Sequence, residues 1–106
     1  MANTYKNAKL DLTTTNATAL YTAASLTTGI VKSIIVSEDS GNADTVTLTL
    51  TNGSTVYSLF KTKAIGANAT VELLTAPLVI QPAEILKVTA ATANRLHVVA
   101  SVLEIT

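Results

Sequence analysis

The 106-residue chain contains no cysteine, which excludes a disulfide framework, a thiolate metal site and a cysteine nucleophile. Tryptophan is absent too, and a single histidine, His97, leaves too few ligands for a zinc site. Only 13% of the residues are charged and their formal charges sum to zero, so nothing indicates a nucleic-acid or anionic-membrane partner. The sequence therefore predicts a protein without a metal or cofactor.

Long hydrophobic runs are missing as well. The longest, residues 34–36 and 77–80, fall far short of the roughly 20 residues that a membrane-spanning helix requires. Residues 1–11 lack the apolar centre of a secretory signal. The four glycines are isolated from one another, unlike those of a phosphate-binding loop. Export, membrane insertion and phosphate binding are therefore not expected.

Threonine, with 19 residues, and alanine, with 16, are the commonest residue types, and valine and isoleucine together add 17. β-Branched side chains suit the pleated surface of a sheet better than they suit a helix. Where most globular chains carry charge on their surface, this chain has the short neutral side chains of threonine and serine. Such a surface favours a protein held in an assembly over a freely diffusing enzyme.

Short apolar stretches separated by turn residues recur along the chain. The clearest is the strict alternation over residues 45–51, which Asn52-Gly53 and residues 55–61 complete as a hairpin with a type I′ turn. Residues 26–37 are apolar on both faces, which predicts a central strand or one covered by a partner. Further strands are expected over residues 16–22, 70–74, 77–80, 84–90 and 95–105.

This organisation predicts the fold class. Seven to nine short strands without a helical stripe indicate an all-β protein, an antiparallel β-sandwich of jelly-roll or Greek-key type. Residues 1–9 are polar and are expected to form an N-terminal arm, and residues 10–106 a single sandwich domain.

Few residues could carry chemistry. His97 lies in the middle of a strand, and we expect it at a strand surface or a subunit contact rather than in catalysis. Three acidic residues lie in or beside the turn at residues 38–44, which we expect to be solvated because it lacks the glycine and glutamate of a calcium loop. An enzyme would need His97 and two carboxylates to converge in a pocket. The sequence predicts that the protein is not an enzyme.

Six segments carry a resemblance to a known family: TALYT (18–22), GIVKSIIV (29–36), SGNADTVTLTL (40–50), VELL (71–74), PLVIQPAEILKV (77–88) and LHVVASVLEI (96–105). In this order they resemble small virion structural proteins of tailed phages of the marine and cyanobacterial type. Two turns depart from the family's pattern. Residues 23–25 read Ala-Ala-Ser where the family often has a Pro-Ala-Gly-like turn, and residues 83–84 read Ala-Glu where it often has Gly-Asp.

The resemblance implies a component of the virion, assembled in the host cytoplasm. The leading expectation is a capsid decoration or cement protein that stabilises the phage head. Its partners would be further copies of itself, with a trimer suiting the three-fold positions of a capsid, and the major capsid protein or other virion proteins. Neither nucleic acid nor membrane is an expected partner.

Two alternatives stay open: a tail, neck or fibre component, and a carbohydrate- or receptor-binding module on the virion surface. The second would need a platform of exposed aromatic side chains, which Tyr5, Tyr21 and Tyr57 could supply. For the structural role, the expected interface lies on the arm, on the two-faced strand and on the last strand. Its residues are Tyr5, Leu10, Leu12, Ile30, Ile34, Val36, His97, Val99, Leu103 and Ile105.

Overall fold

The computed structural model describes residues 2–106, which form nine β-strands and no helix. The strands are β1 (Asn3–Asp11), β2 (Thr18–Thr22), β3 (Thr28–Glu38), β4 (Asp44–Asn52), β5 (Thr55–Ile65), β6 (Thr70–Glu72), β7 (Leu78–Ile80), β8 (Ile85–Ala90) and β9 (Leu96–Ile105). In this described part of the chain, no helix is available to cross a membrane.

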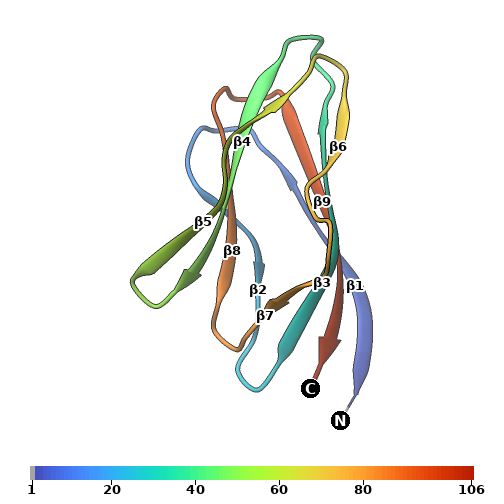
Figure 1. Cartoon of the computed structure of the whole chain (residues 1–106), viewed down its shortest axis with the longest axis vertical. Helices are drawn as coiled ribbons and strands as arrows, with labels where there is room; N and C mark the ends of the chain where they lie inside the picture. The colour runs from blue at the N-terminus through green and yellow to red at the C-terminus, as the bar shows by residue number, and fades with distance from the viewer. Residues whose placement is uncertain (1) are drawn as a thin grey trace.

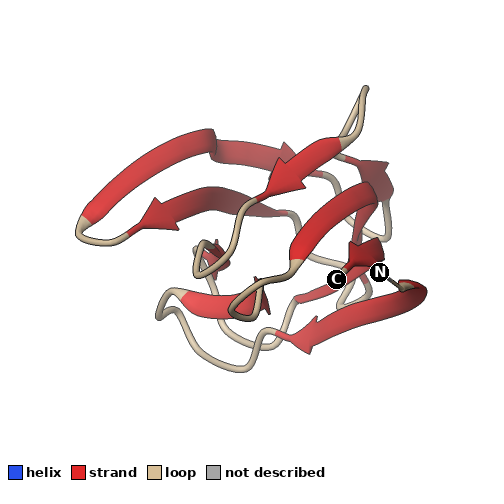
Figure 2. Ribbon diagram, turned by 90° about the horizontal axis from the view of Figure 1, so that it is seen from below, coloured by secondary structure: helices blue, strands red, loops and turns tan. Residues whose placement is uncertain are grey.

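The strands form two antiparallel sheets that pack face to face (Figures 1 and 2). Sheet A has the order β1-β9-β3, with β6 and β7 both paired to the far edge of β3, and sheet B has the order β2-β8-β4-β5. Because β6 and β7 follow one another along β3, they act as one interrupted strand. Counted this way, the chain has eight strands. Sheet A holds the first, eighth, third and sixth strands, and sheet B holds the second, seventh, fourth and fifth, which is the strand order of a jelly roll. The predicted β-sandwich is confirmed.

The core lies between the sheets and is filled by the inward-pointing side chains of both. In β4, Val46 and Leu48 are buried while Thr45, Thr47 and Thr49 are partly exposed, as the alternation predicts. The largest fully buried apolar side chains come from both sheets and their connections: Leu12, Val31, Ile34, Val36, Val46, Leu48, Ile65, Ile80, Leu86, Val88 and Leu96.

The predicted hairpin is confirmed, but its turn differs from the predicted type. Asn52 pairs with Thr55, so the two turn residues are Gly53 and Ser54 rather than Asn52 and Gly53. Gly53 has a φ of 62° and Ser54 has no positive φ. A positive φ at the first turn residue alone is the pattern of type II′, in which glycine takes the first position. The hairpin tip extends beyond the body of the sandwich, at the lower left of Figure 1.

The predicted N-terminal arm was wrong for residues 3–9, which belong to β1. This strand pairs with β9 over nine consecutive residue pairs, from Asn3↔Ile105 to Asp11↔His97. Backbone hydrogen bonds in both directions between Ala2 and Thr106, at 3.2 and 3.0 Å, continue the ladder and hold the two ends of the chain side by side (Figure 1). The polar composition of the segment reflects its position at a sheet edge, where both faces are largely exposed.

Candidate functional site

The outer face of sheet A carries a continuous row of apolar side chains. Tyr5 in β1 lies opposite Leu103 in β9, Leu103 lies opposite Ile30 in β3, and Ile30 lies opposite Val79 in β7. Directly opposed residues on neighbouring strands point to the same face and contact one another. We call these four residues the apolar row. It spans the full width of sheet A.

The apolar row is open to solvent. Tyr5 is 73% exposed and Val79 is 51% exposed, while Ile30 and Leu103 between them are half-buried. A second apolar pair, Val99 and Ile35, lies opposite one another farther along the same face, and these side chains are 42% and 40% exposed. Single exposed apolar residues are common, whereas a contiguous apolar surface with a polar rim marks an interaction site.

The structure divides the ten predicted interface residues between two faces. Six lie on the outer face of sheet A and are at least partly exposed: Tyr5, Ile30, His97, Val99, Leu103 and Ile105. The prediction was wrong for Leu12, Ile34 and Val36, because their side chains are at most 2% exposed and fill the core. Leu10 also points inward and packs against that core.

A β-bulge explains part of this error. Strict alternation along β3 would place Ile30, Ile34 and Val36, the three interface residues predicted on this strand, on one face. The register between β3 and β9 shifts between Val31 and Ser33, so the inward and outward positions exchange there. Ile30 therefore points outward and Ile34 inward. Of the adjacent residues Ile34 and Ile35, Ile35 is the one that points outward, and it was not among the predicted interface residues.

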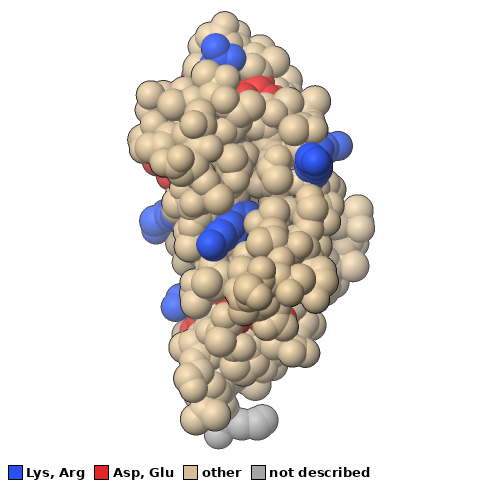
Figure 3. All heavy atoms as spheres, turned by 90° about the vertical axis from the view of Figure 1, so that its left-hand side faces the viewer, with Lys and Arg blue, Asp and Glu red and all other residues tan. Residues whose placement is uncertain are grey.

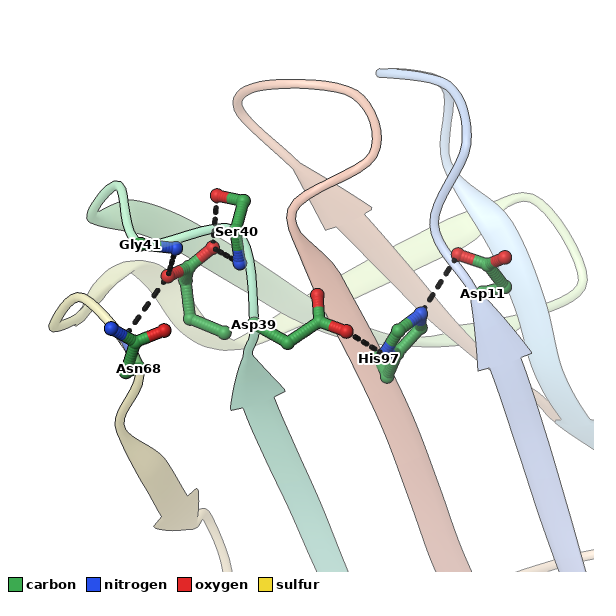
Figure 4. Close-up of polar contacts among 7 residues, drawn as sticks. Asp11, Asp39, Ser40, Gly41, Asn68 and His97 are labelled. Carbon is green, nitrogen blue, oxygen red and sulfur yellow. Dashed lines mark hydrogen bonds and ion pairs between the residues drawn. The ribbon is translucent and has the colours of Figure 1, made fainter.

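At one end of the same face, His97 lies between two carboxylates (Figure 4). Its Nε2 is 3.2 Å from an oxygen of Asp11, and its Nδ1 is 3.4 Å from an oxygen of Asp39. Asp11 ends β1 and Asp39 follows β3, so the imidazole links the two strands that flank β9. A ring protonated on both nitrogens donates to both carboxylates.

This convergence of a histidine and two carboxylates is the arrangement that the enzyme alternative required, but it lies at the surface. The three side chains are 44–65% exposed, beside an open hollow of about 250 Å³. Both ring nitrogens face carboxylates, and no serine or threonine hydroxyl contacts the ring among the described hydrogen bonds. The two nitrogens also point to opposite sides of the ring, and no group of three or more His, Asp or Glu side chains within residues 2–106 is placed to hold one metal ion.

The turn at residues 38–44 was expected to be solvated, but Glu38 shows that it is not simply so. Glu38 is 2% exposed. Its carboxylate accepts hydrogen bonds from the backbone N–H groups of Ser40 at 2.8 Å, Gly41 at 3.1 Å and Asn68 at 3.0 Å, and it also accepts one from the Ser40 hydroxyl (Figure 4). Burial alone would raise the pKa of Glu38, but these hydrogen bonds outweigh it and lower the pKa to about 2. The carboxylate joins the β3–β4 turn to the β5–β6 turn.

Asp44, at the end of the same turn, is also buried. It is 7% exposed, and one of its carboxylate oxygens accepts the backbone N–H of Thr92 at 3.2 Å. The acidic residues of this turn therefore have separate structural partners rather than a shared ligand site. No sequence signal distinguishes a carboxylate that binds backbone amides in this way from a solvated one.

A second buried polar contact lies at the opposite end of the sandwich. The Tyr21 hydroxyl donates to Glu104 at 2.6 Å, and Lys6 lies 3.5 Å from the other carboxylate oxygen of Glu104. Burial, followed by the neighbouring Glu104 carboxylate, raises the pKa of Tyr21 above its usual range. Tyr21 therefore belongs to the core and is unavailable to a ligand.

The other two tyrosines do not form an aromatic platform together. Tyr5 lies on β1 in sheet A, and Tyr57 lies on β5 at the far edge of sheet B. A sugar-binding site would need these rings to share one surface. The arrangement therefore gives no support to the carbohydrate-binding alternative.

The outer face of sheet B differs from that of sheet A. Thr47 lies opposite Thr89, and Thr49 lies opposite Lys87, so the neighbouring outward positions are polar. On this side of the molecule, basic and acidic side chains are scattered among neutral ones rather than gathered in a patch (Figure 3). The exposed apolar side chains of sheet B, which are Val56, Tyr57 and Leu59, all lie on its edge strand β5.

Fold and surface together define a class: an all-β jelly-roll domain in which an apolar row crosses the outer face of sheet A, while β4 and β8 of sheet B carry polar side chains outward. No protein-family model and no curated protein matches the chain.

Proposed function

We propose that this chain is a virion structural protein of a tailed phage, and most specifically a capsid decoration or cement protein. The observation that carries the proposal is the exposed apolar row across sheet A, from Tyr5 to Val79. Burying apolar surface stabilises an assembly by about 25 cal/mol per Å². The outer face of sheet A would stabilise the phage head by packing on the capsid.

Three further observations support a structural role. The sequence resembles small tailed-phage virion proteins in the order of its segments. The jelly roll is an architecture that viral capsid proteins also use. The only histidine is held between two exposed carboxylates, and none of the hydrogen bonds among residues 2–106 joins it to a hydroxyl group.

In this proposal the protein resides in the virion after assembly in the host cytoplasm. The major capsid protein is the partner beneath the outer face of sheet A, and further copies of the chain are lateral partners. A trimer would suit capsid three-fold positions, but no feature of the described residues favours three copies over two. A tail, neck or fibre position is the second candidate location for the same apolar face.

The first experiment locates the protein on purified particles of the phage that encodes it. Antibody–gold labelling scored by electron microscopy should place gold over the heads. Gold confined to tails or necks would replace the decoration role with the alternative location. Particles without label, from infected cells that contain the protein, would contradict the virion assignment.

The second experiment tests the apolar row itself. The double variant Tyr5→Ser/Val79→Ser should lose most of its binding to particles stripped of the protein, measured by co-sedimentation. The matched control is Tyr57→Ser/Val56→Ser, which removes a tyrosine and a valine that are 52% and 60% exposed on the β4–β5 hairpin. The control should bind as the wild type does. Equal binding by both double variants would remove the apolar row from the interface.

A further inference from the structure

The four edges of the two sheets are not equivalent. In β5 the register shifts at two places and Thr62 has a φ of 50°, and in the short β2 it shifts once. The edge formed by β6 and β7 consists of two three-residue strands separated by residues 73–77. Bulges, short strands and interruptions are devices that keep an edge from pairing with another chain. β1 alone has nine residues in an unbroken register.

The free backbone groups of β1 follow from its pairing with β9. Ala2 exchanges hydrogen bonds with Thr106, and the Leu12 N–H donates to Leu96. Because such bonds alternate along an antiparallel pair, the even-numbered residues of β1 bond to β9. The odd-numbered residues direct their N–H and C=O groups to the open edge. These residues are Asn3, Tyr5, Asn7, Lys9 and Asp11, of which Asp11 also accepts the Thr13 N–H at its C=O, at 3.0 Å.

Lysines often protect an edge from pairing, but the two lysines of β1 are both held by its own chain. Lys6 lies 3.5 Å from Glu104, and the Lys9 ammonium donates to the Asn7 side chain at 3.2 Å. Neither ammonium group has to be placed against a second positive charge when another strand approaches. The edge is therefore open in its backbone and not protected by its charges.

We propose that β1 pairs antiparallel with β1 of a second copy of this chain, in a register centred on Asn7. Odd-numbered residues must face odd-numbered residues, so the possible registers differ by steps of two residues. The register centred on Asn7 pairs all nine residues of β1. Centring the pair on Lys6 or Lys9 would instead place a lysine directly opposite its own copy.

The same register gives favourable side-chain neighbours. On the outer face, Lys9 lies opposite the partner's Tyr5, where an ammonium group and an aromatic ring attract each other. Asp11 lies opposite the partner's Asn3, and Lys6 on the inner face lies opposite the partner's Ala8. Like charges directly across from each other would destabilise the pair, and this register has none.

The consequence is one continuous sheet through two copies, related by a two-fold axis at Asn7. The apolar row of one copy then continues through Lys9 of the partner toward the partner's Val99. The pairing replaces the expected trimer with a pair as the basic unit. It is a property of the isolated chain and does not depend on the virion role.

The decisive variant is Asn7→Pro. Proline removes an N–H that faces the open edge and not β9, so the monomer keeps its ladder bonds while the pair loses its centre. Sedimentation over a concentration series should show a monomer–dimer equilibrium for the wild type and for Asn7→Ala, which keeps the backbone N–H. Asn7→Pro should remain monomeric, with an unchanged circular dichroism spectrum. A monomeric or trimeric wild type would overturn the proposal, as would a dimer that survives Asn7→Pro.

Two measurements keep the test independent of how well the proline variant folds. Amide hydrogen exchange should show concentration-dependent protection at Tyr5, Asn7 and Lys9, while even-numbered amides are protected at every concentration. The chain has no cysteine, so Asn7→Cys provides a single thiol on the two-fold axis. Cα atoms of a bonded pair lie about 5.5 Å apart, within the range of about 4.4–6.8 Å for a disulfide.

Oxidation should therefore cross-link Asn7→Cys into a covalent dimer, whereas the control Asn3→Cys should remain uncross-linked because Asn3 faces Asp11 of the partner. The reverse result would show a different register. A dimer that Tyr5→Ser/Val79→Ser abolishes, without protection of the odd-numbered amides, would mean that copies pack face to face through the apolar row. The reverse cross-linking result would overturn the register centred on Asn7. Face-to-face packing would overturn the β1 pairing itself and assign the apolar row to contacts between copies.

Discussion

In both sheets, alternate residues of each strand point outward, but the outer faces of sheets A and B carry different side chains. On sheet A, Leu103 and Ile30 occupy neighbouring outward positions, and on sheet B the equivalent neighbours are Thr47 and Thr89. The fold demands apolar residues only on the inner faces, and sheet B shows that a polar outer face is compatible with it. The apolar residues on the outer face of sheet A are therefore not explained by the stability of the monomer. We propose that an interaction explains them.

The largest expected effect separates the two faces of one strand. Ile34 and Ile35 are adjacent in β3, but Ile34 is fully buried and Ile35 is 40% exposed. Ile34→Ala should lower the free energy of unfolding by about 2–5 kcal/mol, because it leaves a cavity in the core. Ile35→Ala should cost about 1 kcal/mol or less. Urea denaturation of the two variants measures the difference.

The comparison between these two variants also tests the bulge at residues 31–33. Equal losses of stability would contradict the assignment of Ile34 to the core and Ile35 to the outer face, because adjacent residues of a strand point to opposite faces. A larger loss for Ile35→Ala would reverse the assignment of the two faces. Either outcome would contradict the placement of Ile35 on the exposed outer face of sheet A, beside Val99.

A smaller effect is expected where the edge strand of sheet B meets β3. A Cβ atom added at Gly29 would lie 2.6 Å from the ring of Tyr21. Gly29→Ala should therefore displace the tyrosine from Glu104 and destabilise the fold by about 1–3 kcal/mol. The matched control is Gly66→Ala, whose Cβ would lie 3.6 Å from that of Ala69, an ordinary contact.

Thermal unfolding would measure both glycine variants, and the control should change the stability by no more than about 0.5 kcal/mol. A Gly29→Ala variant as stable as the wild type would show that Tyr21 moves without cost. In that case the tyrosine contact would not be part of what fixes the spacing between the sheets at this end.

Acid should weaken the turn that Glu38 organises. The pKa of Glu38 falls from its ordinary 4.5 to about 2 in the folded chain, so the carboxylate stabilises the fold fully above its ordinary pKa. This contribution should be lost progressively as the pH falls from about 5 toward 2. Urea denaturation across that range should give a steep pH dependence for the wild type and a flatter one for Glu38→Gln.

Ser40→Ala provides a graded comparison for Glu38. It removes the hydroxyl donor but keeps the three backbone donors, so its pH dependence should lie between those of the wild type and Glu38→Gln. The pKa of Glu72 is also lowered, by the Ser33 hydroxyl and by two backbone N–H groups that outweigh its burial. Some acid sensitivity should therefore remain in Glu38→Gln. An unchanged slope in that variant would contradict the role assigned to its hydrogen bonds.

Much of the fold could be predicted because local signals agree with it. Alternation over residues 45–51 and the Asn52-Gly53 turn placed the β4–β5 hairpin correctly, and the apolar residues of β3 indicated its central position. The turn type was missed because the strand extends to Asn52, one residue farther than predicted, which moves glycine to the first turn position. Boundaries of this kind depend on pairing across the hairpin and not on local preference.

The candidate site was harder to predict because it depends on which face each residue occupies. A single bulge exchanged inward and outward positions in β3, and period-two reasoning therefore selected Ile34 instead of Ile35. Along β1, which has no bulge, Tyr5 and Leu12 have opposite parity and could not share one face. Val79 carried no signal, since its exposure depends on the pairing of a three-residue strand with β3.

The smallest expected effect concerns His97, the polar end of the apolar face. Its ion pairs with Asp11 and Asp39 join exposed side chains, and such pairs contribute about 0–1 kcal/mol. A double-mutant cycle with His97→Ala and Asp39→Ala, measured on dilute monomer, should give a coupling energy within that range. A coupling well above it would make this end of the face part of what holds the monomer together. The contrast between the two outer faces would then rest on the apolar row alone. The double variant Tyr5→Ser/Val79→Ser should leave the free energy of unfolding of the monomer nearly unchanged.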